Sequence, residues 1–246
     1  MTEPPELTIK VFADGAELDA IAKLAASPLI KGFTTNPTLM RKAGVADYRA
    51  FAQAVLRAVP DKPVSFEVFA DDFEGMRDQA TEIGRWGRNV NVKIPVTNTG
   101  GVSSEPLIRE LSRRGVSLNV TAVFTLEQVQ GIAAALDPAV PAIVSVFAGR
   151  IADTGRDPIP IMRACKAALR ALPRAALLWA SPRELLNVFH AQEAGADIIT
   201  MTPDMLAKLK GVGKDLTEFS RETVEMFYRD AQAAAYTIAL TRPTAA

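Results

Sequence analysis

The chain has 246 residues, 48% of them hydrophobic, so it can bury a large core and suits one α/β barrel better than a disordered or fibrous chain. Twenty-eight basic residues balance twenty-eight acidic ones, which excludes a global charge that would recruit nucleic acid or an anionic membrane. The single cysteine, Cys165, excludes an intrachain disulfide, and no apolar run approaches the roughly 20 residues that span a bilayer.

Short apolar runs typical of β-strands alternate along the chain with longer segments of helical apolar spacing. In chain order the expected strands are residues 8–13, 32–35, 64–69, 90–96, 116–123, 142–148, 175–180 and 197–201. Amphipathic helices are expected between them, among them residues 16–26, 73–86, 126–136 and 158–172. Residues 215–238 show a further, partly apolar helical stripe after the last strand–helix unit.

Signals for helix ends support these boundaries. Asp72 and Thr125 are suited to be the N-cap residues of two helices. Pro203 is suited to be the first residue of the eighth helix. Glycines follow other helices, and we expect left-handed residues at Gly87, Gly115 and Gly195.

Eight strand–helix units with short connections favour a parallel sheet closed into a (β/α)8 TIM barrel. We therefore predict one barrel domain over residues 1–246, with residues 215–238 as a C-terminal helical extension. A doubly wound open sheet is the alternative, but no GxGxxG motif follows a strand.

Polar residues recur where the predicted strands end. Barrel interiors are usually filled by branched apolar side chains, and buried polar groups cost free energy unless they are paired. Because seven strands carry such a residue, we expect them to converge on an active site; they are Asp14, Asn36, Glu67, Lys93, Asn119 with Thr121, Ser145 and Ser181.

Lys93 lies within an otherwise apolar strand and is the strongest single candidate. A desolvated lysine loses part of its preference for the charged form, so its free amine can attack a carbonyl. The alternatives are a lysine whose amine reaches water and a buried ion pair. Lys10 competes for the role, but its early place in the first strand puts it near the barrel floor.

The two carboxylates, Asp14 and Glu67, are suited to proton transfer in a Schiff-base aldol cleavage. Either can instead be an ion-pair partner of Lys93.

Arg150 and Arg183 follow the sixth and seventh strands, and Ser181 stands beside the second arginine. Arginines and hydroxyls at this end of a barrel commonly bind phosphate, although either arginine alone can be a surface residue. His190 is the only histidine, so we expect no metal site and no histidine-based triad.

Four segments resemble the transaldolase family and the related fructose-6-phosphate aldolases. They are GFTTNP at residues 32–37, VKIP at 92–95, SVFAGRI at 145–151 and ASPR at 180–183. The resemblance covers residues 8–210 and implies a class I aldolase-like barrel that needs no cofactor. It further implies sugar phosphates as substrates and a ring-shaped homo-oligomer, such as a decamer, in which a terminal helix reaches a neighbouring subunit.

The resemblance also implies roles for individual residues. Lys93 forms the Schiff base, Asp14 handles the proton of the hydroxyl beside the bond that breaks, and Glu67 and Thr121 hold a catalytic water. The implied substrate-binding residues are Thr34, Asn36 and Asn119 for the donor, Ser145 for the dihydroxyacetone unit, Phe147 for the wall of the site, and Arg150, Ser181 and Arg183 for the phosphate.

Two departures from the family pattern limit the resemblance. The chain is shorter than the long transaldolases, so it is similar to the small subgroup. Pro182 replaces the usual aromatic residue, which weakens the inference at Arg183 relative to Arg150.

The expected function is a cytoplasmic transaldolase of the pentose phosphate pathway, which transfers a dihydroxyacetone unit from fructose 6-phosphate or sedoheptulose 7-phosphate to an aldose phosphate. No secretory signal, nucleic-acid partner or membrane partner is expected. A fructose-6-phosphate aldolase is the nearest alternative; those enzymes typically carry glutamine and tyrosine where this chain has Glu67 and Phe147. Two further alternatives are a transaldolase-like enzyme of a specialised sugar pathway and a barrel that binds sugar phosphates without catalysis.

Overall fold

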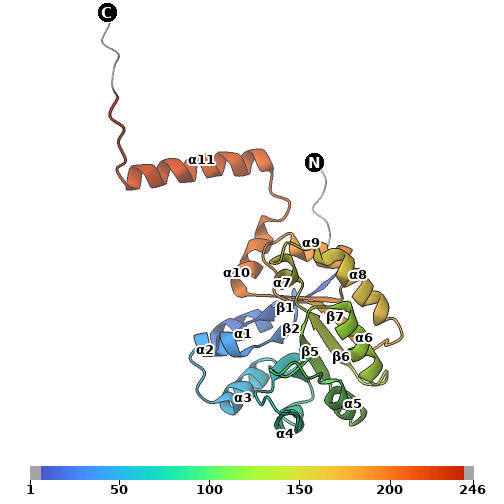
Figure 1. The fold of residues 1–246 in the computed structure, drawn as a ribbon. Helices are drawn as coiled ribbons and strands as arrows, with labels where there is room; N and C mark the ends of the chain where they lie inside the picture. The colour runs from blue at the N-terminus through green and yellow to red at the C-terminus, as the bar shows by residue number, and fades with distance from the viewer. Residues whose placement is uncertain (1–6, 241–246) are drawn as a thin grey trace, which may run out of the picture. The chain divides into compact units, whose positions relative to one another are not determined.

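The computed structural model describes residues 7–240, and within them eight parallel strands close into one barrel (Figure 1). The strands follow one another around the barrel in chain order, and each pairs with its neighbours in parallel register. The predicted (β/α)8 barrel is therefore confirmed. The strands are β1 (Lys10–Asp14), β2 (Ile30–Thr34), β3 (Val64–Glu67), β4 (Val90–Pro95), β5 (Leu118–Val123), β6 (Ala142–Val146), β7 (Ala175–Trp179) and β8 (Ile198–Met201).

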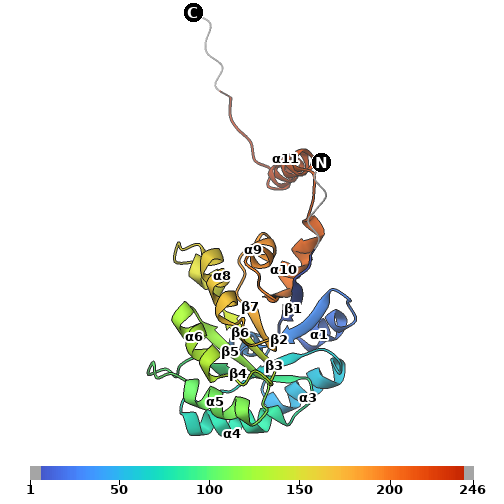
Figure 2. The same ribbon diagram turned by 90° about the vertical axis from the view of Figure 1, so that its right-hand side faces the viewer.

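Helices form the outer layer around these strands, as the turned view in Figure 2 shows. The barrel helices are α1 (Leu18–Ala25), α2 (Pro37–Lys42), α3 (Tyr48–Ala58), α4 (Phe73–Gly84), α5 (Glu105–Arg113), α6 (Leu126–Ala135), α7 (Ala148–Ala152), α8 (Pro158–Ala168), α9 (Asn187–Glu193) and α10 (Pro203–Ala207), followed by the 3-10 helix η1 (Lys208–Gly211).

Most of the predicted helix ends are present. The Asp72 side chain accepts from Gly75 N, Thr125 forms a capping box with Gln128, and Pro203 is the first residue of α10. Gly115 and Gly195 have the expected positive φ. The prediction was wrong for Gly87, because α4 ends at Gly84 and Arg85 caps it in a right-handed conformation.

The core has two parts that follow from strand alternation. A large layer of buried apolar side chains fills the space between strands and helices, and a small inner cluster fills the barrel around Phe12, Ile143, Leu178 and Ile198. Gly32 is required beside this cluster, because a Cβ there would lie 2.5 Å from the Phe12 ring. The inner cluster leaves the carboxyl ends of the strands to polar residues.

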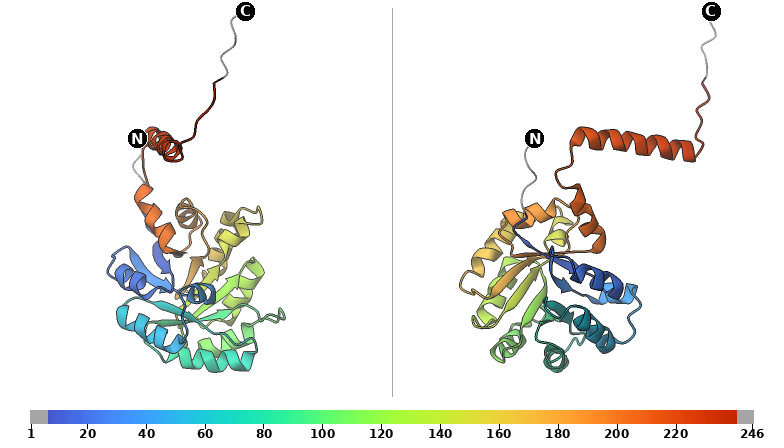
Figure 3. Two further views of the ribbon diagram at one scale, coloured as in Figure 1. Left: turned by 90° about the vertical axis from the view of Figure 1, so that its left-hand side faces the viewer. Right: turned by 180° about the vertical axis from the view of Figure 1, so that it is seen from behind.

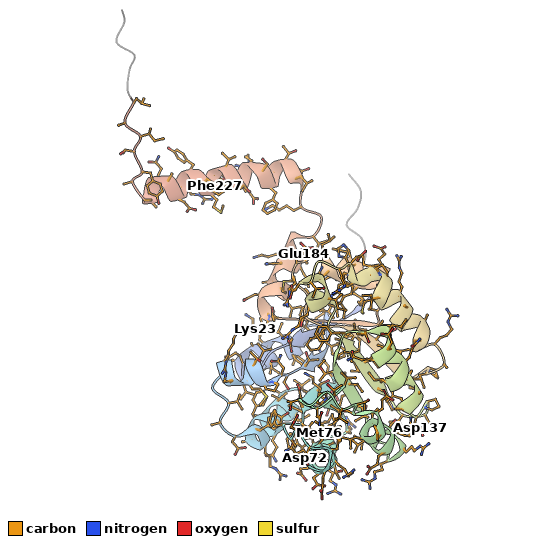
Figure 4. All side chains as sticks on the ribbon, in the orientation of Figure 1. Lys23, Asp72, Met76, Asp137, Glu184 and Phe227 are labelled. Carbon is orange, nitrogen blue, oxygen red and sulfur yellow. The ribbon has the colours of Figure 1, made fainter. Side chains whose placement is uncertain are left out.

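The described residues fall into two compact units, 7–209 and 210–240. The barrel forms the first unit (Figure 3). The second contains α11 (Leu216–Ala233), which ends before the expected residue 238 at a left-handed Ala235. No residue of α11 is buried, and Phe227 is one of its exposed apolar side chains (Figure 4).

The predicted ends of the domain, residues 1–6 and 241–246, lie outside the described residues. None of the helices in residues 7–240 has the length and apolar character required to cross a membrane.

Candidate active site

Lys93 lies in the middle of β4, with only 6% of its surface exposed. Its Nζ is 2.9 Å from Glu67 Oε2 and donates to the Thr35 carbonyl at 2.7 Å. The ammonium is thus held by a carboxylate and a main-chain oxygen, as a buried charge requires. The ion pair that the sequence left as an alternative is present, and it joins two candidate catalytic groups.

Asp14, at the end of β1, is part of the same cluster. It accepts a hydrogen bond from Thr34 Oγ1 at 2.8 Å and two longer ones from Asn36 Nδ2 at 3.3 and 3.5 Å. Burial raises the pKa of Asp14, while the Lys93 charge and these hydrogen bonds oppose the rise. A carboxylate with a raised pKa accepts a proton more readily once it is ionised, which suits a general base.

Asn36 has two structural partners in this arrangement. Its Oδ1 caps α2 by accepting from Leu39 N at 3.0 Å, and its amide nitrogen donates to Asp14. Both ends of the side chain are therefore held, and Asn36 lies at the site with a fixed orientation.

Strand register brings Glu67, Lys93 and Asn119 side by side. In the β3–β4 and β4–β5 pairs, Glu67 is aligned with Lys93, and Lys93 is aligned with Asn119. Asn119 accepts from Ser145 Oγ at 2.7 Å and donates to Ser65 Oγ at 3.0 Å. Four neighbouring strands, β3 to β6, thus place polar side chains next to one another.

Thr121 lies two residues beyond Asn119 on β5 and is buried. The register of β5 against β6 shifts after Val120, where Ala122 has a φ of 58°. Such a bulge changes the direction of the following residues and is frequent near active sites. Within the described part of the chain, the Thr121 hydroxyl has no hydrogen-bond partner, so it is free to bind a ligand or water.

The opposite side of the barrel mouth carries the predicted anion-binding residues. Phe147 follows β6, and the Arg150 guanidinium lies over its ring at 5.4 Å. Ser181 follows β7 and has a φ of 57°, a left-handed conformation that is uncommon for serine. Its carbonyl oxygen packs on Gly149 so closely that a Cβ there would lie 1.5 Å away.

Arg183 is exposed and forms a bidentate ion pair with Asp153, the residue that follows α7. Its Nε donates to Oδ1 at 3.0 Å, and its terminal nitrogen donates to Oδ2 at 2.5 Å. The pair lowers the pKa of Asp153 and raises that of Arg183. Two N–H groups of Arg183 are therefore already bound to Asp153, whereas Arg150 forms no ion pair within residues 7–240.

Sequence patterns did not identify Ser65 and Thr200 as members of the site. Thr200 of β8 lies 2.6 Å from Thr34 Oγ1 and must donate to it, because that hydroxyl donates to Asp14. Each is a polar residue within an apolar strand, and Ser65 shares the inward parity of Glu67, but these are weak signals when taken alone. Lys10 lies at the start of β1 and is exposed, as expected for a residue at the barrel floor.

Other candidate groups lie away from this chemistry. Cys165 is buried, and burial raises its pKa to about 11. Residues 7–240 contain no group of three or more histidine, cysteine, aspartate or glutamate side chains arranged to hold a metal ion.

Comparison with known proteins places these residues in a family context. The sequence profile described as Transaldolase/Fructose-6-phosphate aldolase matches residues 11–238. A probable transaldolase of Dehalococcoides mccartyi is 34% identical over 202 residues, covering 82% of this chain and 90% of the relative. A probable transaldolase of Carboxydothermus hydrogenoformans is 32% identical over 226 residues, covering 92% of this chain and 99% of the relative.

Solved structures agree with the fold. An HpcH/HpaI aldolase/citrate lyase family protein from Burkholderia cenocepacia has a TM-score of 0.58 at 14% identity, covering 88% of this chain and 95% of its own. Dihydrodipicolinate synthase from Rhodopseudomonas palustris has a TM-score of 0.53 at 15% identity, and the match covers 79% of this chain and 70% of the synthase. At these identities the similarity concerns the barrel alone.

Proposed function

Because the chain belongs to the transaldolase/fructose-6-phosphate aldolase family, we propose that it is a transaldolase. It transfers a dihydroxyacetone unit from a ketose phosphate to an aldose phosphate through a Schiff base on Lys93. The observation that carries the proposal is the buried Lys93 ammonium, 2.9 Å from Glu67 and in the same polar cluster as Asp14.

The first stage forms the covalent intermediate. The Lys93 ammonium gives a proton to the adjacent Glu67 carboxylate, and the free amine attacks the C2 carbonyl of the ketose. Loss of water from the resulting carbinolamine leaves an iminium ion. Glu67, together with the unpartnered Thr121 hydroxyl, is suited to return the proton to the departing water and later to activate water for hydrolysis.

The second stage breaks and remakes a carbon–carbon bond. Asp14 takes the proton of the C4 hydroxyl, the C3–C4 bond breaks, and its electrons flow to the iminium nitrogen to give an enamine. The aldose phosphate leaves, and the acceptor aldehyde takes its place. The enamine then attacks the acceptor carbonyl while Asp14 returns the proton, so that no external oxidant or reductant is needed.

The substrate contacts follow from the positions of the remaining side chains. Asn36 bonds to Asp14, and Asn119 is aligned with Lys93 and bonds to Ser145, so these side chains are suited to bind the donor hydroxyls. Arg150 and Ser181, with the N–H groups of Arg183 that Asp153 does not bind, are suited to bind the phosphate at the other side of the mouth.

A coupled assay with fructose 6-phosphate, run with and without erythrose 4-phosphate, tests this function. Glyceraldehyde 3-phosphate that forms only when the acceptor is present supports a transferase. Equal product without acceptor would instead assign the fructose-6-phosphate aldolase activity, and no product in either arm would contradict both.

The cellular setting is part of the proposal. We place the enzyme in the cytoplasm and in the pentose phosphate pathway, which is consistent with a single, buried thiol and with sugar phosphate substrates. We also propose a ring-shaped homo-oligomer, because α11 exposes Leu216, Phe219 and Phe227, and such a row of apolar side chains favours burial against another subunit.

A further inference from the structure

The hydroxyl of Tyr48, the first residue of α3, contacts the main chain of Glu67. It accepts from Glu67 N at 2.8 Å and donates to the Glu67 carbonyl at 3.0 Å. One phenol thus satisfies both main-chain groups of the residue whose carboxylate faces Lys93. Nothing in the reaction proposed above uses this side chain.

The hydrogen-bond ladder between β2 and β3 explains why the contact matters. Phe33 N donates to Pro63 O, and Thr35 N donates to Ser65 O. Bonds in a parallel ladder recur at every second residue, so the next would join Glu67 N to the Thr35 carbonyl. In this structure Glu67 N donates to Tyr48 instead, and the Thr35 carbonyl accepts from Lys93 Nζ at 2.7 Å.

The Tyr48 hydroxyl therefore replaces the next β2 carbonyl as the partner of β3. By taking the Glu67 N–H, it ends the ladder one bond early and leaves the Thr35 carbonyl to the lysine. The same contact fixes the backbone of Glu67 at the end of β3, where the ladder no longer holds it.

The ring of Tyr48 is itself held firmly. It packs edge-on against Phe66 and Trp86, with ring centroids 6.2 and 5.4 Å away, and it is tilted against Phe69 at 4.6 Å. Burial raises the pKa of Tyr48, so the phenol keeps its proton and can both donate and accept.

We propose that Tyr48 is a positioning residue, which holds Glu67 and the Thr35 carbonyl in the arrangement that the Lys93 amine requires. The inference rests on the proposed function, because it assigns Tyr48 a part in the lysine chemistry. Removal of the hydroxyl leaves two partly buried main-chain groups of Glu67 without this partner, and Glu67 N regains a bond to the Thr35 carbonyl only if the strand moves toward it.

The test compares Tyr48→Phe with Trp86→Phe. The first removes only the hydroxyl, while the second alters the same aromatic cluster without any hydrogen bond to Glu67, since Trp86 Nε1 donates to Glu82. Melting temperatures are measured first, and kinetics are compared where both variants are folded. We expect Tyr48→Phe to lower kcat by about tenfold to 100-fold with KM within about twofold, because small misplacements of catalytic groups have effects of this size.

Trapping of the lysine adduct with borohydride at saturating fructose 6-phosphate should slow in parallel with kcat. Trp86→Phe should keep kcat within about twofold, and 3-fluorotyrosine at position 48, which retains the hydroxyl and the packing, should do the same. Unchanged kcat in Tyr48→Phe, a loss confined to KM, or an equal loss in Trp86→Phe would each overturn the inference. An unmodified enzyme without transfer or adduct would refute the proposed function itself.

Discussion

Gly149 provides a sharp perturbation of the predicted phosphate site. It lies in α7 one residue before Arg150, its N–H donates to the Ala180 carbonyl at 3.2 Å, and its Cα faces the left-handed Ser181. In Gly149→Ala the new Cβ would lie 1.5 Å from the Ser181 carbonyl oxygen and 2.5 Å from its carbon. Ordinary contact between such atoms is about 3.5 Å, so α7 and the turn at Ser181 must separate by roughly 2 Å.

The atoms that clash belong to the main chain, so no side-chain rotation relieves the contact. Overpacking of this kind destabilises a protein by about 1–3 kcal/mol. Because Arg150 and Ser181 lie on opposite sides of the contact, we expect kcat/KM for fructose 6-phosphate to fall about 100-fold in the transfer assay. The loss should be smaller with an unphosphorylated donor.

Gly84→Ala is the matched control for this variant. A Cβ at Gly84 would lie 3.7 Å from Val116 and 3.8 Å from Val92, which is ordinary contact, and alanine favours a helix. Its kcat/KM should stay unchanged. If Gly149→Ala also stays within about twofold of the unmodified enzyme, α7 and the Ser181 turn do not form the phosphate site together.

Three further predictions follow from the site and the second unit. Glu67→Gln, nearly isosteric, should raise acceptor-free cleavage of fructose 6-phosphate relative to transfer; an unchanged ratio in the coupled assay would mean that Glu67 is structural. Since burial raises the pKa of Asp14 in the folded protein, its contribution to stability is present at low pH and is lost as the pH rises through that pKa. Asp14→Asn should therefore melt at a higher temperature than the unmodified enzyme at pH 8 but not at pH 4, while kcat falls about 100-fold or more; the opposite pH trend would contradict this reasoning. Truncation after Gly213 should lower the mass seen by light scattering and preserve the far-UV circular dichroism of the barrel, whereas a full-length monomer at micromolar concentration would refute the proposed oligomer.

The alternating apolar pattern was sufficient to predict the barrel and the inward face of β3, β4 and β5. Because a strand has a period of two residues, the parity of Glu67, Lys93 and Asn119 could be assigned from the sequence, and the register aligns all three. Strand ends were less accurate: the first strand begins at Lys10 rather than residue 8, where Thr8 N bonds to the Gln192 side chain.

Other parts of the site depend on contacts between distant segments, which local patterns do not contain. Threonine is common in strands, and one small serine in an apolar strand indicates little, so Thr200 and Ser65 carried little signal by themselves. The Arg183–Asp153 pair joins residues 30 positions apart, and the Tyr48 contact reaches from a helix to the end of another strand. Such pairings follow from how the barrel closes, not from spacing along the chain.

Covalent trapping identifies the nucleophilic lysine directly. The enzyme is incubated with fructose 6-phosphate, reduced with borohydride, digested and analysed by mass spectrometry. We predict a stable three-carbon adduct on the peptide that contains Lys93, and its absence from Lys93→Ala. An adduct that persists in Lys93→Ala, or one located on another lysine such as Lys10, would contradict the assignment of Lys93 as the nucleophile.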